Sequence, residues 1–153
     1  PWRVPTLLGA ITVESLATGG GLPAPIAAKA LAIAPRMHNS FKLAVDGGVK
    51  IALGTDAGVM KHGTNAREFA LMVRYGMTPM QAIVAGTSSG ATLLGLEREI
   101  GTIAVGKRAD IVAVAGNPLD NVDILQNMQF VMKGGRVFKR DGQVLGRSAA
   151  GVP

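Results

Sequence analysis

The segment "IALGTDAG" (51–58) ends a strand-like run in an aspartate flanked by glycines. The carboxylate of Asp56 either closes off the strand as a turn former or is held out at the strand end to act on a substrate. Asp and Gly are common turn residues, so "GTDAG" taken alone favours the turn former. In a parallel α/β barrel, however, functional groups sit where strands end and loops begin. Asp56 is therefore the first candidate for chemistry.

The chain contains two histidines, His38 and His62, and each is a possible partner of Asp56 in a functional site. His62 follows Asp56 in the next loop, where a histidine is either solvated or functional. His38 stands between Met37 and Asn39 in a helical segment, and we interpret it as structural. A catalytic zinc normally has three protein ligands and an open position. Asp56, His62 and His38 do not make such a site by themselves.

A predicted βαβ unit positions Asp56. The run "VPTLL" (4–8) predicts a short buried strand, and the Gly-rich residues 17–25 predict a loop. Two helical segments that abut at Pro35 come next, and residues 49–55 form a second buried strand. Two strands joined by a helical crossover are expected to be parallel.

Two further helices are predicted after Asp56. Asn65 can cap the first, with Glu68 at the third helical position, and Thr78 with Gln81 forms a capping box for a second helix over 79–94. The predicted buried stripe of the first helix is Ala66, Phe69, Ala70, Val73 and Met77.

The chain changes character after Glu99. Short β-type runs separated by Gly, Asn and Pro predict an antiparallel sheet in a separate layer. Residues 129–142 read as a hairpin joined at Gly134 and Gly135. Residues 147–153 predict a poorly structured end.

Composition narrows the class of protein. The chain has 153 residues, 48% hydrophobic and 17% charged, with a net charge of +6 and no cysteine. The basic residues form no stripe, and one Trp and one Tyr offer little stacking, so we expect no nucleic-acid partner. The longest apolar run (25–35) is too short for a bilayer and contains Lys29, and no secretory signal is visible, so we expect a cytoplasmic protein.

Four blocks of sequence, taken together and in order, resemble one family. They are "GVKIALGTDAG" (48–58), "HGTNAREFALMVRYGMTPMQAIVAGTSSGATLLGL" (62–96), "IGTIAVGKRADIVAVAGNPLDN" (100–121) and "VMKGGRVF" (131–138). They are similar to the C-terminal third of a metal-dependent amidohydrolase. The branch they resemble comprises imidazolonepropionase-like and Xaa-Pro dipeptidase-like enzymes, which include metallo-carboxypeptidases.

The resemblance implies an α/β fold, the C-terminal part of a TIM-type (β/α)8 barrel plus strands of a small β-sandwich. Residues 1–99 would be the last strands and helices of the barrel, with 4–8 as the seventh strand and 49–55 as the eighth. Residues 100–153 would be the C-terminal part of the composite β-sandwich. Because the chain starts at Pro1 without Met, we expect a piece of something longer.

The resemblance also implies the site. Asp56 would bind one or two Zn²⁺ ions, or another divalent metal, and shuttle the catalytic proton during amide hydrolysis. His62 would contact a small-molecule or peptide substrate, of the dipeptidase or carboxypeptidase type. The family's other metal ligands lie on strands one to six, so this segment alone is predicted to be inactive. We expect the remainder of the barrel, from the same or a second chain, as a partner, in a homo-oligomer without nucleic acid or membrane.

Three alternatives stay open at this point. The scaffold could open cyclic amides or deaminate. The chain could be a non-catalytic structural or assembly module, with Asp56 as a turn former. The third is an anion or nucleic-acid binding module that uses the positive charge.

Overall fold

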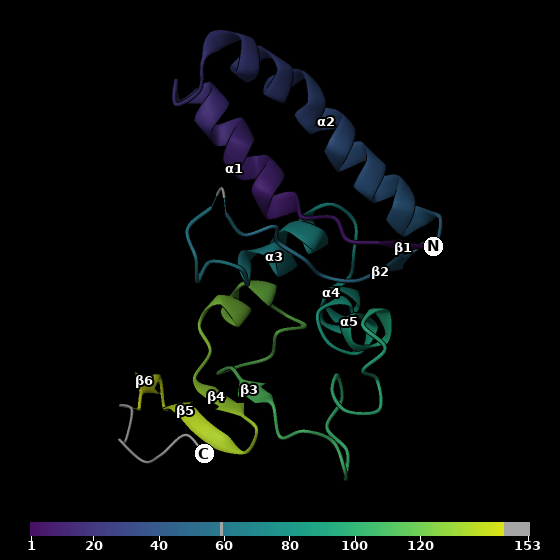
Figure 1. Ribbon diagram of the computed structural model, residues 1–153, viewed down its shortest axis with the longest axis vertical. Coiled ribbons are helices and arrows are strands. Elements are labelled where there is room, and N and C mark those ends of the chain that lie inside the picture. The colour runs from purple at the N-terminus through teal and green to yellow at the C-terminus, as the bar shows by residue number, and fades with distance from the viewer. Residues whose placement is uncertain (59, 146–153) are drawn as a thin grey trace.

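The structure, a computed structural model, describes residues 1–58 and 60–145. A pair of long helices lies at one end, short helices lie in the middle, and an antiparallel sheet lies at the opposite end (Figure 1). In chain order the elements are β1 (Trp2–Arg3), α1 (Leu7–Thr18), α2 (Ala24–Asp46), β2 (Lys50–Ile51), α3 (Arg67–Arg74), α4 (Pro79–Ala85), α5 (Ser88–Leu93), β3 (Ile111–Ala113), η1 (Val122–Gln126), β4 (Phe130–Lys133), β5 (Arg136–Arg140) and β6 (Gln143–Val144). The poorly structured end predicted for 147–153 falls outside the described residues. Within 1–58 and 60–145, no helix is long and apolar enough to cross a membrane.

Strands β1 and β2 pair in parallel, with Trp2 opposite Lys50, which confirms the predicted direction. The prediction of a strand over 4–8 was wrong, because the strand ends before Pro5 and helix α1 begins at Leu7. Thr6 has a left-handed backbone with a φ of 49°, which turns the chain out of the extended direction.

The second strand is also shorter than the predicted 49–55, since β2 ends at Ile51. After Ile51 the chain continues without regular hydrogen bonding between strands. The Ala52 N–H donates to Arg3 O at 3.0 Å, and the Leu53 N–H donates to Ala85 O at 3.0 Å. The residues before Asp56 are therefore held by β1 on one side and by the end of α4 on the other.

Helices α1 and α2 lie side by side and run in opposite directions (Figure 1). The Gly-rich connection is shorter than predicted, because α1 continues to Thr18 and α2 begins at Ala24. Helix α2 also continues through Pro35 instead of breaking there. Proline removes one helical N–H donor and crowds the preceding turn, but buried Ala34 and Phe41 keep the helix packed on both sides of it.

The capping box before α4 is present as predicted. The Thr78 N–H donates to Gln81 Oε1 at 2.8 Å, and the Gln81 N–H donates to Thr78 Oγ1 at 3.2 Å. The single helix predicted over 79–94 is divided into α4 and α5 around Gly86. A Cβ at Gly86 would lie 2.6 Å from two ring carbons of Phe69, so glycine is needed for α4 to end against α3.

The C-terminal sheet has the order β3-β4-β5-β6, and its neighbouring strands are antiparallel. Strands β4 and β5 form the predicted hairpin. Gly134 and Gly135, at its tip, have φ values of 55° and 79°, which suits a type I′ turn.

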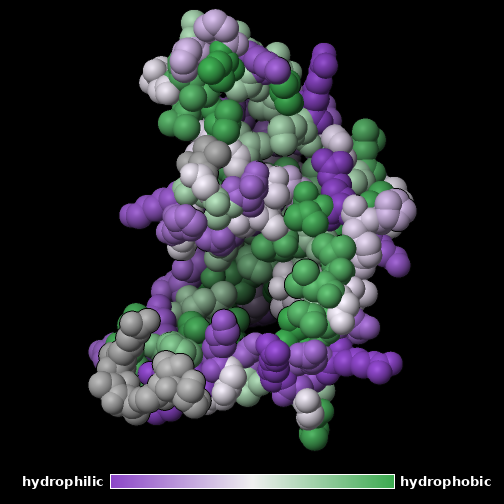
Figure 2. Space-filling view, in the orientation of Figure 1, coloured by the Kyte–Doolittle hydropathy of each residue, from purple (hydrophilic) through white to green (hydrophobic). Residues whose placement is uncertain are grey.

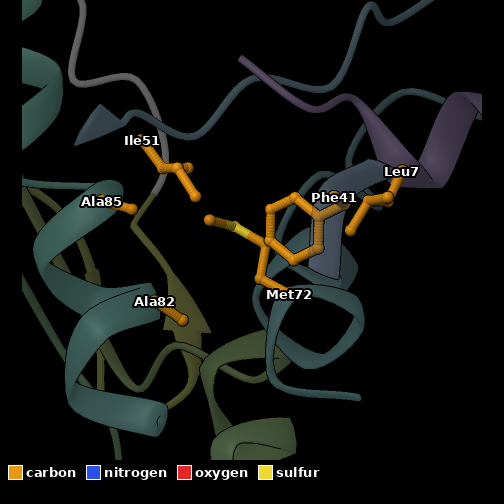
Figure 3. Close-up of a cluster of buried hydrophobic side chains, with 6 residues drawn as sticks. All are labelled: Leu7, Phe41, Ile51, Met72, Ala82 and Ala85. Carbon is orange, nitrogen blue, oxygen red and sulfur yellow. The ribbon is translucent and has the colours of Figure 1, made fainter. Parts of the chain in front are cut away.

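The buried core joins the start of α1 and the C-terminal part of α2 to the central helices. Its cluster consists of Leu7, Phe41, Ile51, Met72, Ala82 and Ala85. The Phe41 ring lies beside Met72 in Figure 3, with Leu7 on the far side of the ring. Burial of side chains of this size contributes about 1.5–3 kcal/mol each.

Large apolar residues are also exposed. Leu43 is 71% exposed, Leu94 is 68% exposed and Ile103 is 84% exposed. Hydrophobic residues reach the surface across the middle of the face in Figure 2. Apolar patches of this kind mark surfaces that bind ligands or other chain segments.

Candidate functional site

Asp56 follows the last residues held by β1 and α4, and its side chain is exposed. Its φ of 49° is left-handed, a conformation that Asp adopts more readily than most residues. The preceding Thr55 is 8% exposed, and its hydroxyl accepts a hydrogen bond from Asn65 Nδ2 at 2.8 Å. Gly54 allows the chain to pass close to Val4, whose Cγ1 an added Cβ would strike. An anchored segment that follows β2 thus presents Asp56 in a defined backbone conformation.

A hollow of about 370 Å³ opens between α1 and α2 beside Asp56. Its lining consists of Thr6, Gly9, Ala10, Val13, Ile26, Lys29, Ala30, Ile33, Ala34, Met37 and Asp56. The two helices face each other here through small residues, such as Ala10 and Ala30, and this leaves space between them. Lys29 and Asp56 are the charged residues among this lining, and the other lining residues are mainly apolar. Asp56 therefore contributes one carboxylate to a mainly apolar hollow.

His62 lies in a turn before α3, and its side chain is exposed. The turn is closed by Thr64, whose hydroxyl donates to Lys61 O at 2.6 Å. His62 is not among the described residues that line the hollow beside Asp56. The structure therefore does not bring the two predicted site residues into one hollow.

His38 packs within the fold. Its ring stacks on Tyr75 at 4.3 Å between centroids, with 16° between the planes. This contact joins α2 to the end of α3 and agrees with the structural interpretation of His38.

The described residues do not form a complete metal site. Across 1–58 and 60–145, no group of three or more His, Cys, Asp or Glu side chains is placed to hold a metal ion. Asp56 offers one exposed carboxylate, which suits a single ligand of a divalent ion. A metal at this position would need further ligands from outside the described residues.

Glu68 is a buried carboxylate whose role the sequence reasoning missed. It was predicted to pair with an Asn65 cap, but Ala66 occupies the N-cap position of α3 and the Asn65 side chain bonds to Thr55. Glu68 is instead fully buried, and its two carboxylate oxygens accept the N–H groups of Leu7 and Leu8, each at 2.7 Å. Burial raises the pKa of the Glu68 carboxyl, and the two backbone hydrogen bonds oppose this rise.

The buried face of α3 also differs from the predicted stripe. Glu68 and Met72 are its fully buried residues, while Phe69, Val73 and Met77 pack around the core as partly buried residues. A carboxylate at the start of an amphipathic stretch normally indicates an exposed first turn. In the structure the Glu68 carboxylate instead caps α1, which has neither a side-chain cap nor an acidic residue in its own first turn.

Comparison with known proteins gives consistent matches. The model of the amidohydrolase family matches residues 10–139. Ochratoxinase of Aspergillus niger is 35% identical over 137 residues, which cover 86% of this chain and 28% of the ochratoxinase. Imidazolonepropionase of Geobacillus kaustophilus (strain HTA426) is 27% identical over 140 residues, which cover 86% of this chain and 32% of that protein.

A solved structure agrees with these matches. A Xaa-Pro dipeptidase with bound methionine in the active site superimposes with a TM-score of 0.86 and 40% identity, over 90% of this chain and 34% of that chain. The chain thus spans between 28% and 34% of the length of these three proteins. They include both groups of enzymes that the sequence blocks resemble, which confirms the resemblance. Since the family match runs from α1 into β5, the chain belongs to the amidohydrolase family.

Proposed function

We propose that this chain is the C-terminal part of a metal-dependent hydrolase that cleaves amide C–N bonds in peptide-like substrates, of the dipeptidase or carboxypeptidase type. The observation that carries the proposal is the Asp56 carboxylate, exposed after a parallel strand and bordering an apolar hollow. Family membership supports amide hydrolysis, and the likeness to a Xaa-Pro dipeptidase with bound methionine supports a peptide-like substrate.

The proposed architecture assigns β1 and β2 to the last two strands of a TIM-type barrel, with residues 1–99 as its C-terminal part. Residues 100–153 are then the C-terminal part of a small β-sandwich. The parallel pairing of β1 with β2 supports this assignment, because strands of such a barrel are parallel. The remaining strands come from the same or a second chain. We use "complete enzyme" below for the protein that contains them together with this chain.

Asp56 has the central chemical role in this proposal. One carboxylate oxygen accepts the proton of the attacking water, and the same carboxylate delivers that proton to the nitrogen of the leaving amine. The hydrogen bond from Asn65 to the Thr55 hydroxyl fixes the residue before Asp56. His62, in its exposed turn, contacts an oxygen of the substrate.

Amidohydrolases generally use divalent metals. One or two such ions, Zn²⁺ or another, supply polarisation of the scissile carbonyl and a lowered pKa of water when bound. Asp56 contributes one ligand, and the other ligands come from the completing strands.

The complete enzyme provides the test. Dipeptides and N-acyl amino acids are incubated with it before and after treatment with a chelator, and released amine is measured. We expect hydrolysis that is lost with the metal and restored by added Zn²⁺. Hydrolysis that survives demonstrated metal removal would refute metal dependence, and failure with every amide would favour a non-catalytic module.

A second candidate is opening of cyclic amides, or deamination, on the same scaffold. The similarity to imidazolonepropionase favours it. An assay of ring-opened product or released ammonia in the same preparation separates it from cleavage of linear amides.

A further inference from the structure

We propose that Asn65 is a positioning residue for Asp56, and that its side-chain amide, by holding Thr55, keeps Asp56 in the backbone conformation that its proton transfers require. This inference rests on the proposed function and deepens it, because it adds a residue on which the action of Asp56 depends. Asn65 acts through Thr55 and not on the substrate.

The hydrogen bond between Asn65 and Thr55 lies directly next to Asp56 in the chain. Asn65 Nδ2 donates to Thr55 Oγ1 at 2.8 Å, across ten positions of sequence. The Thr55 side chain is buried, so little water is available to replace Asn65 as its partner. The last buried residue before the exposed Asp56 is therefore fixed by this one side chain.

The conformation of Asp56 needs such a hold. Its φ of 49° lies in the left-handed region, which L-residues adopt less readily than the extended or right-handed helical regions. A residue persists there only when the surrounding structure determines its conformation. Release of Thr55 frees Asp56 to return to the commoner regions, and that rotation of the backbone carries the carboxylate away from its place.

Asn65 is itself held by the turn that leads into α3. Asn65 O accepts the Glu68 N–H at 3.0 Å. The buried Glu68 carboxylate in turn accepts the N–H groups of Leu7 and Leu8, each at 2.7 Å. The turn 65–68 is thus tied to the start of α1, which gives the Asn65 side chain a fixed base.

The two segments held by this turn meet beside Asp56. A Cβ added at Gly9 would lie 3.6 Å from Thr55 O, so α1 packs against the residue that Asn65 holds. Among the described residues, three that are not glycine have a positive φ, namely Thr6, Asp56 and Asp141. Thr6 and Asp56 both line the hollow, and each is next to a segment bound by the turn 65–68. Strained residues of this kind cluster at active sites.

Stabilisation of α3 does not account for the use of Asn65. Asparagine is among the best N-cap residues, yet the N-cap of α3 is Ala66 and no side chain caps this helix. The Asn65 amide instead bonds to Thr55, in the segment before Asp56. The local helix gains nothing from this bond, whereas the segment that carries Asp56 does.

The first test removes each partner of the bond in the complete enzyme. Asn65→Ala removes the donor, Thr55→Val removes the acceptor with little change of shape, and Thr55→Ser keeps a hydroxyl. A misplacement of about 1 Å costs on the order of 100-fold in rate. With the dipeptide that the parent cleaves fastest, we expect Asn65→Ala and Thr55→Val to lower kcat by about 10- to 100-fold with KM close to that of the parent. Thr55→Ser should retain most of the activity.

Asn117→Ala is the matched control. Asn117 is also exposed, and its Nδ2 also donates to a side-chain oxygen, that of Asp120 Oδ2 at 3.0 Å. It lies outside the residues that line the hollow, so its loss should leave kcat unchanged. Equal falls in kcat for Asn65→Ala and Asn117→Ala, or a rise in KM alone for Asn65→Ala, would overturn the proposal.

The double variant Asn65→Ala/Thr55→Val asks whether the two residues act through their shared bond. It should lose no more kcat than the more impaired single variant, because both changes remove the same hydrogen bond. Losses that multiply would mean that the residues act independently, which contradicts a role of Asn65 through Thr55.

The backbone of Asp56 is measured independently of activity. Crystal structures of the complete enzyme compare the parent, Asn65→Ala and Asn117→Ala. We expect a left-handed Asp56 in the parent and in the control, and a negative φ in Asn65→Ala. A left-handed Asp56 in Asn65→Ala would overturn the proposal whatever the kinetics. A parent that cleaves no amide would refute the proposed function, while the change in φ would still show that Asn65 holds Asp56.

Discussion

Leu7 donates its backbone N–H to Glu68 Oε1 at 2.7 Å, across 61 positions of sequence. The second carboxylate oxygen accepts the N–H of Leu8 at the same distance. Glu68 thus supplies the N-terminal cap that α1 lacks. Because α1 is one wall of the hollow and α3 follows the Asp56 loop, this carboxylate ties the hollow to the loop that borders it.

Replacement of Glu68 by glutamine should destabilise the protein. The side-chain NH2 of glutamine faces one of two backbone N–H donors and leaves it unpaired, which costs about 1–3 kcal/mol in a buried place. Urea unfolding at pH 7 measures the change. Glu97→Gln is the control, because Glu97 is an exposed glutamate, and it should unfold like the parent. Equal stability of Glu68→Gln and the parent would contradict the capping role.

The pH dependence of the same pair of proteins follows from the raised pKa of Glu68. The folded state holds the Glu68 proton more tightly than the unfolded state, whose pKa is near the ordinary 4.5. The contribution of Glu68 titration to stability is therefore fully present below pH 4.5 and is lost as pH rises through the folded pKa. We expect the stability difference between the parent and Glu68→Gln to shrink with rising pH. A difference that grows with pH would mean a lowered pKa.

Asp56→Asn should abolish turnover of the complete enzyme by several orders of magnitude while the fold survives. Asparagine keeps the shape and tolerates the left-handed backbone but lacks the charge and the proton acceptor. Asp141→Asn is a matched control, because Asp141 is exposed and has a similar φ of 50° in the β5–β6 turn. A loss under about tenfold, which is about 1.4 kcal/mol of barrier, would make Asp56 a turn former.

His62→Ala should raise KM, with a smaller fall in kcat, and leave the metal content unchanged. The reason is that a loop side chain suits contact with substrate better than it suits a rigid metal site. Steady-state kinetics and metal analysis on the same variant provide the measurement. Loss of metal would make His62 a ligand, and unaltered kinetics would leave it as a solvated side chain.

Residues 1–153 produced alone should carry no stoichiometric transition metal and should aggregate. One exposed carboxylate cannot hold zinc against water, and the edges of the β1–β2 pair offer unpaired backbone groups to other molecules. Metal analysis and size-exclusion chromatography check both expectations. A soluble monomer with tightly bound zinc would show that the ligands are already present in this chain.

Features with local causes could be predicted from the sequence. The capping box of Thr78 and Gln81 and the glycine pair at 134–135 depend on neighbouring residues, so their patterns are readable along the chain. The parallel direction of β1 and β2 followed from the helical connection between them. The placement of Asp56 directly at the end of that strand was wrong, because β2 ends at Ile51.

Features that depend on distant contacts could not be predicted. Helix α1 has no local cap, and its first residues, Leu7 and Leu8, end the apolar run 4–8 that was predicted as a strand. Its cap is Glu68, which local patterns place in an exposed first turn. The hollow exists because two helices pair through small residues, and no single segment encodes it.

The link between Leu7 and Glu68 also bears on the order of folding. A 12-residue helix without its own cap has little stability in isolation. Its first turn acquires a cap only when α3 has packed in place, and this requires closure of a 61-residue separation, which is slow compared with local helix formation. Helix α1 should therefore become protected from hydrogen exchange late, after the core of α3 and α4 has formed. Helix α1, which lines the hollow beside Asp56, would then be among the last parts of the molecule to gain structure.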